Sequence, residues 1–496
     1  MADEPTLLSN RTSLTDSLVS RRTASRRSIN NSELDESSGY IALELPSPGS
    51  GNFKTLVNGR TTEEALEKCK KEVLSPYQFF LRLLGWQPWI PSGGVVTSFK
   101  ERGFKFLNVI YPIFVTCLLI AGYFTQFGAC YSRDHPMYNI PNDSEAVRGR
   151  YCNSSNDLNP VTKRPFCSHA YSKYLFSDII HFIGFLYGMY IFRWRENEEL
   201  EMLMQKTFIQ TGGGDLHYYL SQKKLSTAVQ AIFYSGIAWI FVNFIASVLG
   251  LFGRLVDCTW TEPWRLGFVS WMDVASPVAM WILIVVMWIG FLAFDLVNIA
   301  VTVNYTTQCQ LIIVLVRGLV QKVHDKTITL QNAIKEFHEA GKAVDALNRQ
   351  MAIVISIMEF NFVSHSILCL HSFYVLRDSF DLLSNSHAEV LFIFSAVLDF
   401  ILWTAIALFP VIQAARVTSA CQSPIKTALE IRTRPFQYQE TKDAEFDSFI
   451  TFLNAQNKKA KLFRIPVVSH YLWALGAAAI FVLLLLVELE IINVDV

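Results

Sequence analysis

Pro466 to Glu490, PVVSHYLWALGAAAIFVLLLLVELE, is the stretch from which the fold of this chain is interpreted. Tyr471 to Val487 contains no charged residue, and at about 1.5 Å of rise per residue the whole stretch crosses the roughly 30 Å hydrocarbon layer of a membrane. The small residues Gly476 to Ala479 would let other helices approach closely. Two acids, Glu488 and Glu490, close the apolar run. The stretch is therefore either a plain anchor helix with its acids among the headgroups or part of a cation pathway.

Composition places the whole chain among membrane proteins. Hydrophobic residues make up 51% of the chain and charged residues only 17%, which is too apolar for a soluble protein of 496 residues. The formal net charge is zero at pH 7, whereas a nucleic-acid partner would require a basic surface. The composition therefore predicts contact with membrane lipid and no nucleic-acid partner.

Six further apolar segments have the length of a membrane-spanning helix. A soluble helical protein would show one polar face on each helix, and these segments mostly do not. We therefore predict an all-α membrane protein with seven transmembrane helices. The predicted spans are Phe106–Phe127, Tyr174–Phe192, Ala228–Leu251, Pro277–Val303, Val354–Leu376, Val390–Val411 and Pro466–Leu489.

The distribution of lysine and arginine orients these spans. With a cytoplasmic N-terminus, 34 of the 43 lysines and arginines lie on the cytoplasmic side and 9 on the other side, as the preference of basic residues for the cytoplasm requires. Without the long N-terminal region, the numbers are still 20 and 9. We predict a cytoplasmic N-terminus and an extracellular C-terminus, the reverse of the usual seven-helix G-protein-coupled receptor.

The first outside loop, residues 128–173, has features of the oxidising side of a membrane. Its sequons predict glycosylation at Asn142 and Asn153. Four cysteines fall on this side, an even number that allows two disulfides in three possible pairings. They are Cys130, Cys152, Cys167 and Cys258, whereas Cys69, Cys117, Cys309, Cys369 and Cys421 fall in the membrane or the cytosol and are predicted to be free thiols.

The N-terminal region divides into two parts. Residues 1–73 are polar, poor in aromatic residues and without apolar periodicity, so we expect a disordered cytoplasmic tail. Residues 74–103 form an amphipathic pre-membrane segment, whose core SPYQFFLRLLGWQPW is too short to span a membrane. This segment is predicted to lie at the cytoplasmic membrane surface with Trp86 and Trp89 at headgroup depth. The alternative is a buried structural helix.

Residues 104–496 form the predicted seven-helix domain, and its cytoplasmic connections are long. No proline interrupts CQLIIVLVRGLVQKV after the fourth span, so this helix is expected to project into the cytosol. Apolar residues at helical spacing continue from Leu330 to the fifth span, and again over Glu445–Leu462. These apolar faces must be buried, which predicts a cytoplasmic helical bundle contributed by residues 304–352 and 412–465, within one chain or between subunits.

The predicted architecture resembles the insect gustatory and odorant receptor superfamily, and more specifically a gustatory receptor-like protein. The shared features are seven spans, the inverted orientation, a short extracellular C-terminus and long cytoplasmic helices. The segment FFLRLLGWQPW is similar to the pre-membrane motif of that family. The family's last helix carries Thr-Tyr, five apolar residues and Gln-Phe, where this chain departs with Ile480-Phe481, VLLLL and Val487-Glu488.

The resemblance implies a homotetrameric, ligand-gated, nonselective cation channel in the plasma membrane, with the last helices lining a central pore. Carried over to this sequence, its hydrophobic gate falls at Leu484, or at Leu485 after a shift of one residue. The same helix face presents Ile480 and Val487 or Glu488 to the pore. Four leucines would close the pore by dewetting, and four Glu488 carboxylates would favour cations. The alternative is that the leucines face lipid.

The resemblance also implies a pocket for a small organic ligand in the outer half of the bundle, among the second to sixth helices. Aromatic walls with a few convergent polar groups suit such a ligand. Ordinary helix packing is the alternative for each candidate, and no cofactor is implied. The candidates are Asp178, His181, Trp239, Asn243, Trp281, His371, Phe373, Tyr374 and Phe394.

Three acids lie deeper in the predicted spans, where a carboxylate is costly unless it is paired or hydrated. They are Asp295, Glu359 and Asp399. We expect structural pairing for Asp295 and Glu359. Asp399, nearer the middle of its span, is the expected polar site for coupling between helices.

Other functions compete with the channel. No nucleophile, acid-base or metal-ligand constellation is visible, so an enzyme or a metal site is not expected. A small-solute transporter would also hold intramembrane acids, but no inverted repeat or matching pair of broken spans is visible. A nonconducting membrane protein of the same fold, with a scaffold, signalling or developmental role, is the main alternative. Conductance separates it from a channel.

Overall fold

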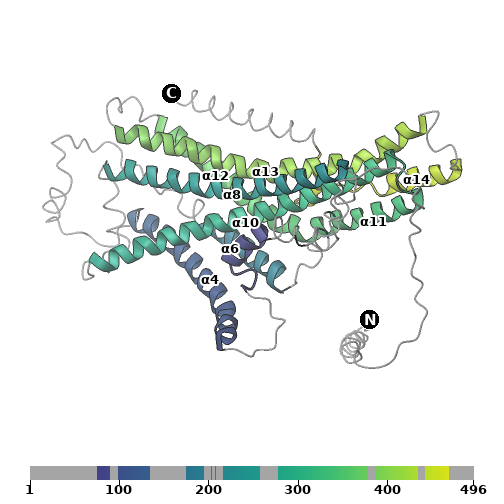
Figure 1. Cartoon of the computed structure of the whole chain (residues 1–496). Helices are drawn as coiled ribbons and strands as arrows, with labels where there is room; N and C mark the ends of the chain where they lie inside the picture. Colours follow the sequence, from purple (N-terminus) through teal and green to yellow (C-terminus); the bar gives the residue numbers. More distant parts are fainter. Residues whose placement is uncertain are drawn as a thin grey trace, which may run out of the picture. The chain divides into compact units, whose positions relative to one another are not determined.

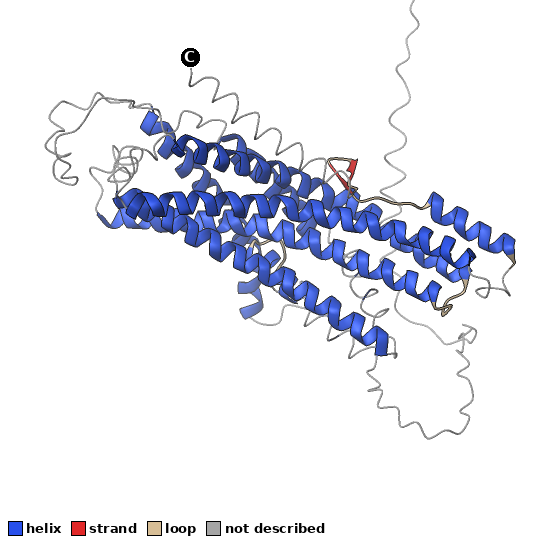
Figure 2. Cartoon of the chain, turned by 90° about the horizontal axis from the view of Figure 1, so that it is seen from above, coloured by secondary structure: helices blue, strands red, loops and turns tan. Residues whose placement is uncertain are grey.

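The computed structural model describes residues 67, 75–89, 99–134, 175–194, 203, 207, 216–256, 277–377, 387–433 and 442–468. This part of the chain is mostly helical, with short turns and one short hairpin (Figure 1 and Figure 2). Several predicted positions lie outside the described residues, among them most of the N-terminal tail and the last span after Val468. These positions include Ile480, Leu484, Leu485, Val487 and Glu488, the sequons at Asn142 and Asn153, and Cys69, Cys152, Cys167 and Cys258.

Six of the seven predicted spans are helices in the structure, and the seventh lies outside the described residues. Five helices of the described part are long and apolar enough to cross a membrane, so the chain is a multi-pass membrane protein. The sidedness remains a prediction. The elements are α3 (Ser75–Leu83), α4 (Phe99–Asp134), α6 (Phe176–Met189), η5 (π-helix, Tyr190–Trp194), α8 (Leu216–Val256), α10 (Pro277–His324), α11 (Leu330–Ala346), η6 (π-helix, Leu347–Met351), α12 (Ala352–Arg377), α13 (His387–Thr433), α14 (Asp443–Ala455), β1 (Lys461–Leu462) and β2 (Ile465–Pro466).

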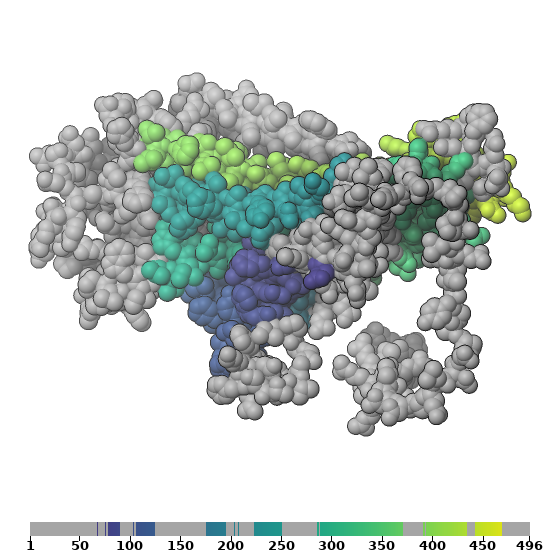
Figure 3. All heavy atoms as spheres, in the orientation of Figure 1, coloured from purple at the N-terminus to yellow at the C-terminus, as the bar shows by residue number. Residues whose placement is uncertain are grey.

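α10 is the central helix of this part. It contacts α3, α4, α8, α11, α12 and α13, and every residue from Val297 to Cys309 is buried. Burial around the whole circumference means that protein surrounds the helix on all sides. α8 and α13 also contact each other and run side by side along one face (Figure 3).

Glycines allow α4 and α10 to cross closely. A Cβ atom added to Gly122 would lie 3.5 Å from the Cα of Gly290, and one added to Gly290 would lie 3.2 Å from the Cα of Gly122. Small residues at such a crossing let two helix backbones meet, which is how helices often associate in membranes. The crossing therefore depends on the absence of side chains at both positions.

The pre-membrane segment is buried against the helices. Trp86 is fully buried, its ring stacks on Phe192 at 5.5 Å, and Gly188 leaves room for it, since a Cβ there would lie 2.6 Å from the Trp86 ring. Arg193 of η5 donates hydrogen bonds to the carbonyl oxygen atoms of Gly85, at 2.6 Å, and Asn108, at 2.5 Å. Trp86 is therefore buried against protein, as the buried-helix alternative describes, and its depth relative to the headgroups stays a prediction.

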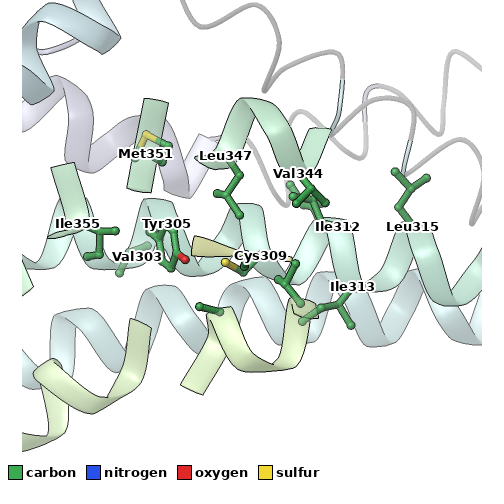
Figure 4. Close-up of a cluster of buried hydrophobic side chains, with 14 of the residues drawn as sticks. Val303, Tyr305, Cys309, Ile312, Ile313, Leu315, Val344, Leu347, Met351 and Ile355 are labelled. Atoms are coloured by element: carbon green, nitrogen blue, oxygen red, sulfur yellow. The ribbon is translucent and has the colours of Figure 1, made fainter. Parts of the chain in front are cut away.

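A second bundle extends the spanning helices. We call it the end bundle, and it consists of α11, α14 and the adjoining parts of α10 (residues 308–324) and α13 (residues 413–433), which contact one another. The hydroxyl of Thr329 caps α11 by accepting from the backbone N–H of Asn332 at 3.4 Å. Apolar side chains from α10, α11, η6 and α12 fill the core beside it (Figure 4). Its cytoplasmic location remains a prediction.

The helical pattern predicted over Glu445–Leu462 breaks after α14. The helix ends at Ala455, and β1 pairs with β2 in antiparallel register, Lys461 opposite Pro466 and Leu462 opposite Ile465. The backbone N–H of Val467 also donates to the Ala460 carbonyl at 2.9 Å. Side chains of η6 and α13 bind the backbone beside β1, and these bonds replace the intrahelical ones.

Candidate functional site

The six described helices at predicted spans all contribute polar or aromatic side chains to one interior site. We call it the polar–aromatic cluster. Most of its members are joined to one another by hydrogen bonds or ring contacts, Asp178 interacts electrostatically with Tyr123, and most of its polar residues are buried. It comprises Tyr123 of α4, Ser177, Asp178 and His181 of α6, Trp239 and Asn243 of α8, Phe294, Asp295 and Asn298 of α10, Asn361 and His365 of α12, and Trp403 of α13.

α6 supplies the polar centre of the cluster. The Ser177 hydroxyl donates to Asn361 Oδ1 and lies 2.9 Å from His365 Nε2. Because the hydroxyl has a single proton, His365 Nε2 must be the donor in the second bond. One turn along α6, His181 Nδ1 lies 2.5 Å from the Tyr123 hydroxyl. These bonds connect α6 to α4 on one side and to α12 on the other.

Aromatic rings pack around these polar groups. His181 stacks on Phe294 with 3.8 Å between ring centroids, and His365 stacks on Trp403 at 4.4 Å. Trp239 meets Trp403 edge to face at 5.6 Å, and its indole N–H donates to the Leu402 carbonyl at 3.1 Å. Ring contacts therefore connect α6, α8, α10, α12 and α13 with one another.

The intramembrane acids differ in their partners. Asn243 Nδ2 donates to Asp295 Oδ2 at 2.8 Å, so Asp295 has the structural pairing expected from the sequence. Asp399 lies close enough to Asp295 for their charges to interact. Glu359 is 4% exposed, and its Oε2 has no hydrogen-bond partner among the described residues. The expectation of a pairing for Glu359 is therefore not met at this atom.

Buried polar atoms of the cluster lack partners. Asp178 Oδ2 and Asn361 Nδ2 make no hydrogen bond with any described residue, although both residues are buried. Leaving such an atom unsatisfied costs about 1–3 kcal/mol. A carboxylate acceptor and an amide donor beside stacked rings would suit a small molecule that combines an aromatic body with hydrogen-bonding groups.

The structure brings together some of the predicted pocket residues and not others. Asp178, His181, Trp239 and Asn243 all belong to the cluster. Phe394 does not point inward, since 56% of it is exposed, and in a membrane it faces lipid or another protein. The remaining candidates lie on described helix backbone, but their side chains are outside the described part; they are Trp281, His371, Phe373 and Tyr374, and the same holds for Cys130.

Sequence reasoning missed more than half of the cluster. Its signal is the spacing of polar residues in apolar spans, because residues four apart share a helix face. Ser177 and His181 have this spacing on α6, as do Asn361 and His365 on α12. The missed members are Tyr123, Ser177, Phe294, Asn298, Asn361, His365 and Trp403.

The metal search and the described cavity give no further feature at the cluster. No group of three metal-ligating side chains occurs among the residues searched. A cavity of about 30 Å³ lies instead in the end bundle, with Phe337, Gly341, Cys421 and Gln456 in its wall. Such a volume holds a water molecule, whereas organic ligands occupy roughly 300 Å³ or more. Cys117, Cys309 and Cys421 are free thiols, as predicted.

Comparison with known proteins gives a limited result. No family model matches the sequence, and no curated protein matches it. The chain is similar to two solved structures of the insect olfactory receptor OR5 from Machilis hrabei, one of them in complex with eugenol. Each receptor chain is 12% identical to this chain, and each match covers 86% of this chain and 99% of the receptor chain. The TM-scores are 0.48 for the complex and 0.46 for the other structure. At this level of similarity the comparison assigns no role to any residue.

Proposed function

We propose that this chain is a gustatory receptor-like channel of the plasma membrane, a ligand-gated and nonselective cation channel that opens when a small organic molecule binds. Four copies surround a central pore, and the last predicted span lines it. The observation that carries the proposal is the polar–aromatic cluster, in which six helices converge on buried polar atoms that have no partner among the described residues. If the bundle had only a structural role, apolar groups in place of these buried polar atoms would make it more stable.

In this proposal, a ligand enters the cluster and takes the places of side chains that are now stacked on one another. It accepts or donates hydrogen bonds at Asp178 Oδ2 and Asn361 Nδ2 and packs against Phe294 and Trp403. Since these residues lie on α6, α10, α12 and α13, binding spreads or rotates the helices relative to one another. A ligand shifts an equilibrium only through such a difference in contacts between two states.

The pore-lining residues of this proposal are assigned from the sequence. Leu484, or Leu485 after a shift of one residue, forms the hydrophobic constriction, and Glu488 supplies four carboxylates that favour cations. Ile480 and Val487 complete the lining. Charge at the mouth and an apolar constriction together describe a cation pore that is closed at rest.

Whole-cell current tests this proposal. Cells express the wild-type chain, Leu484→Ala or Leu485→Ala, while a panel of small organic compounds is applied. Leu486→Ala is the matched control, because residue 486 points about 200° away from residue 484 on a helix. We expect a cation leak from Leu484→Ala or Leu485→Ala and none from Leu486→Ala at equal surface expression. Silence from all variants at the cell surface would favour a nonconducting protein of this fold.

A further inference from the structure

The β1–β2 hairpin holds a strained turn. Its two turn residues, Phe463 and Arg464, both have positive φ, 51° and 64°. This is the conformation of the two-residue hairpin turn that asparagine and glycine prefer, and it is unfavourable for a bulky side chain. Phe463 is also 51% exposed, so burial of its ring does not compensate. The turn must therefore be held by bonds from its surroundings.

Asn348 of η6 holds the strand that enters the hairpin. Its Nδ2 donates to the carbonyl oxygen of Lys459 at 2.9 Å, and its Oδ1 accepts from the backbone N–H of Lys461 at 2.8 Å. One side-chain amide thus binds the backbone on both sides of Ala460, as a neighbouring strand would. The π-helical segment η6 interrupts the regular helix at this position, and such segments are frequent at functional sites.

Two hydroxyls hold the rest of the hairpin. Thr418 Oγ1 of α13 accepts from the backbone N–H of Ala460 at 3.1 Å, and Ser356 Oγ of α12 accepts from the backbone N–H of Phe463 at 2.8 Å. Ala460 is fully buried, so its N–H would otherwise have no partner from water. Side chains from η6, α12 and α13 therefore fix one hairpin.

These bonds connect the polar–aromatic cluster to the C-terminal end of the described chain. Ser356 lies five residues before Asn361 on α12, a rise of roughly 7.5 Å along the helix. Thr418 lies on the same helix as Trp403. The hairpin ends two residues before the last described residue, Val468, and the predicted pore span continues from there. A movement of α12 or α13 at the cluster therefore reaches the start of that span through a few hydrogen bonds.

We propose that Asn348, Ser356 and Thr418 are positioning residues that fasten the hairpin to α12 and α13 and thereby transmit movement of these helices to the C-terminal span. The hydrogen bonds that fasten the hairpin are seen between described residues. The transmission rests on the proposed function, because it requires that the span line a ligand-gated pore.

Hydrogen exchange of the purified full-length protein tests the fastening. Thr418→Val keeps the shape of the side chain but removes the acceptor, and Thr418→Ser keeps the acceptor and is the matched control. Ser356→Ala and Ser356→Thr form a second pair. We expect Thr418→Val and Ser356→Ala to accelerate exchange over Lys459–Val467 at least about tenfold, with unchanged exchange in α14. Unchanged exchange in both would overturn the proposal.

Asn348→Leu removes both bonds to the strand and gives an independent measurement of the fastening. Its expected effect on exchange over Lys459–Val467 is larger than that of either hydroxyl variant, because two backbone groups lose their partner. Should this variant unfold, the isosteric Thr418→Val still decides the result.

Ligand-evoked current tests the transmission. At equal surface expression we expect Thr418→Val and Ser356→Ala to lower the maximal ligand-evoked current several-fold, and Thr418→Ser and Ser356→Thr to restore it. Faster exchange with unchanged current would overturn the transmission while the channel proposal stands. If neither the wild type nor Leu484→Ala or Leu485→Ala conducts, the channel proposal and the transmission both fail, and hydrogen exchange still decides whether the hairpin is fastened.

Discussion

The polar–aromatic cluster and the end bundle share the long helices α10 and α13, yet they differ in the contacts that hold them together. In the end bundle, Phe337 of α11 packs against Phe449 of α14 with 6.3 Å between ring centroids, and the ion pairs lie at the surface. In the cluster, Asp178 and Asn361 are buried with polar atoms that lack a partner within the described part of the chain. The side chains of the end bundle stabilise the fold, whereas the unpaired polar atoms of the cluster destabilise it. Such a local loss of stability is typical of a functional site.

If the end bundle lies in the cytosol, as the sequence predicts, the difference has a physical cause in the two solvents. Helices in water associate because apolar surface is removed from water, which suits the apolar faces of α11 and α14. Helices in lipid gain nothing from apolar contact with one another, so they associate through close packing and hydrogen bonds. The glycine crossing of α4 and α10 and the hydrogen bonds of α6 are contacts of this second kind. The same helix can therefore be held by different forces along its length.

The largest effect is expected in the end bundle. Phe449→Ala removes a ring that is 1% exposed, and truncating a buried phenylalanine typically costs about 3–5 kcal/mol. Thermal unfolding of the detergent-solubilised protein measures the loss. The matched control is Phe463→Ala, because the Phe463 ring is 51% exposed and its removal leaves no comparable cavity. Equal destabilisation by the two variants would contradict this description of the end bundle.

The second effect is expected in the cluster and concerns response rather than stability. Asp178→Asn keeps the size of the side chain but replaces a carboxylate acceptor with an amide. We predict at least about a tenfold rise in the half-maximal concentration of an activating ligand, equivalent to about 1.4 kcal/mol of binding, with little change in thermal stability. Concentration–response curves measure it, and Asp443→Asn at the exposed start of α14 is the control. An unchanged response would remove Asp178 from the ligand site.

A smaller effect is expected for the hydrogen bond between Asn243 and Asp295. A double-mutant cycle with Asn243→Ala, Asp295→Ala and the double variant should give a coupling of about 0.6 kcal/mol and at most about 1.7 kcal/mol, the mean and maximum found for such bonds between membrane helices. Unfolding in mixed detergent micelles measures each variant. As a control, Asn243→Ala combined with the distant Phe449→Ala should be additive within about 0.5 kcal/mol. A coupling near zero would mean that this pair does not hold α8 to α10.

The smallest effect is expected at the surface of the end bundle. Lys458 Nζ lies 3.0 Å from Asp345 Oδ2, and both side chains are about 40% exposed. Exposed ion pairs contribute about 0.2–1 kcal/mol and are weakened by salt. We therefore expect Lys458→Ala to lower the thermal midpoint only slightly, and less at high salt than at low salt. A large loss that does not depend on salt would show that Lys458 stabilises the hairpin in another way.

The spanning helices could be predicted from the sequence because apolar length is a local property. The projection of the fourth span also follows locally, since α10 continues to His324 without a proline. The environment of Trp86 could not be predicted, because an amphipathic aromatic segment fits a membrane surface and a protein groove equally well. The deciding feature is Gly188, whose missing side chain makes room for the Trp86 ring, and it lies about a hundred residues away.

The candidate site was predictable only in part for a similar reason. Asp178 and His181 stand out as polar residues in an apolar span, whereas Tyr123 and Trp403 look like ordinary packing until the helices are brought together. Phe394 shows the converse error, because aromatic character in a span does not reveal which face the residue occupies. The hairpin was missed because Asn348, which binds its backbone, is distant in the sequence.

The measurement that tests the central claim most directly is cation flux through the purified chain in sealed lipid vesicles. No other protein is present, so a positive result assigns conduction to this chain alone. We predict that wild-type vesicles show a flux of Na⁺ and K⁺ above protein-free vesicles when an activating ligand is added, and that Leu484→Ala or Leu485→Ala shows it without ligand. Absence of flux from folded, membrane-inserted protein in the wild type and both variants would contradict the account of this chain as a channel.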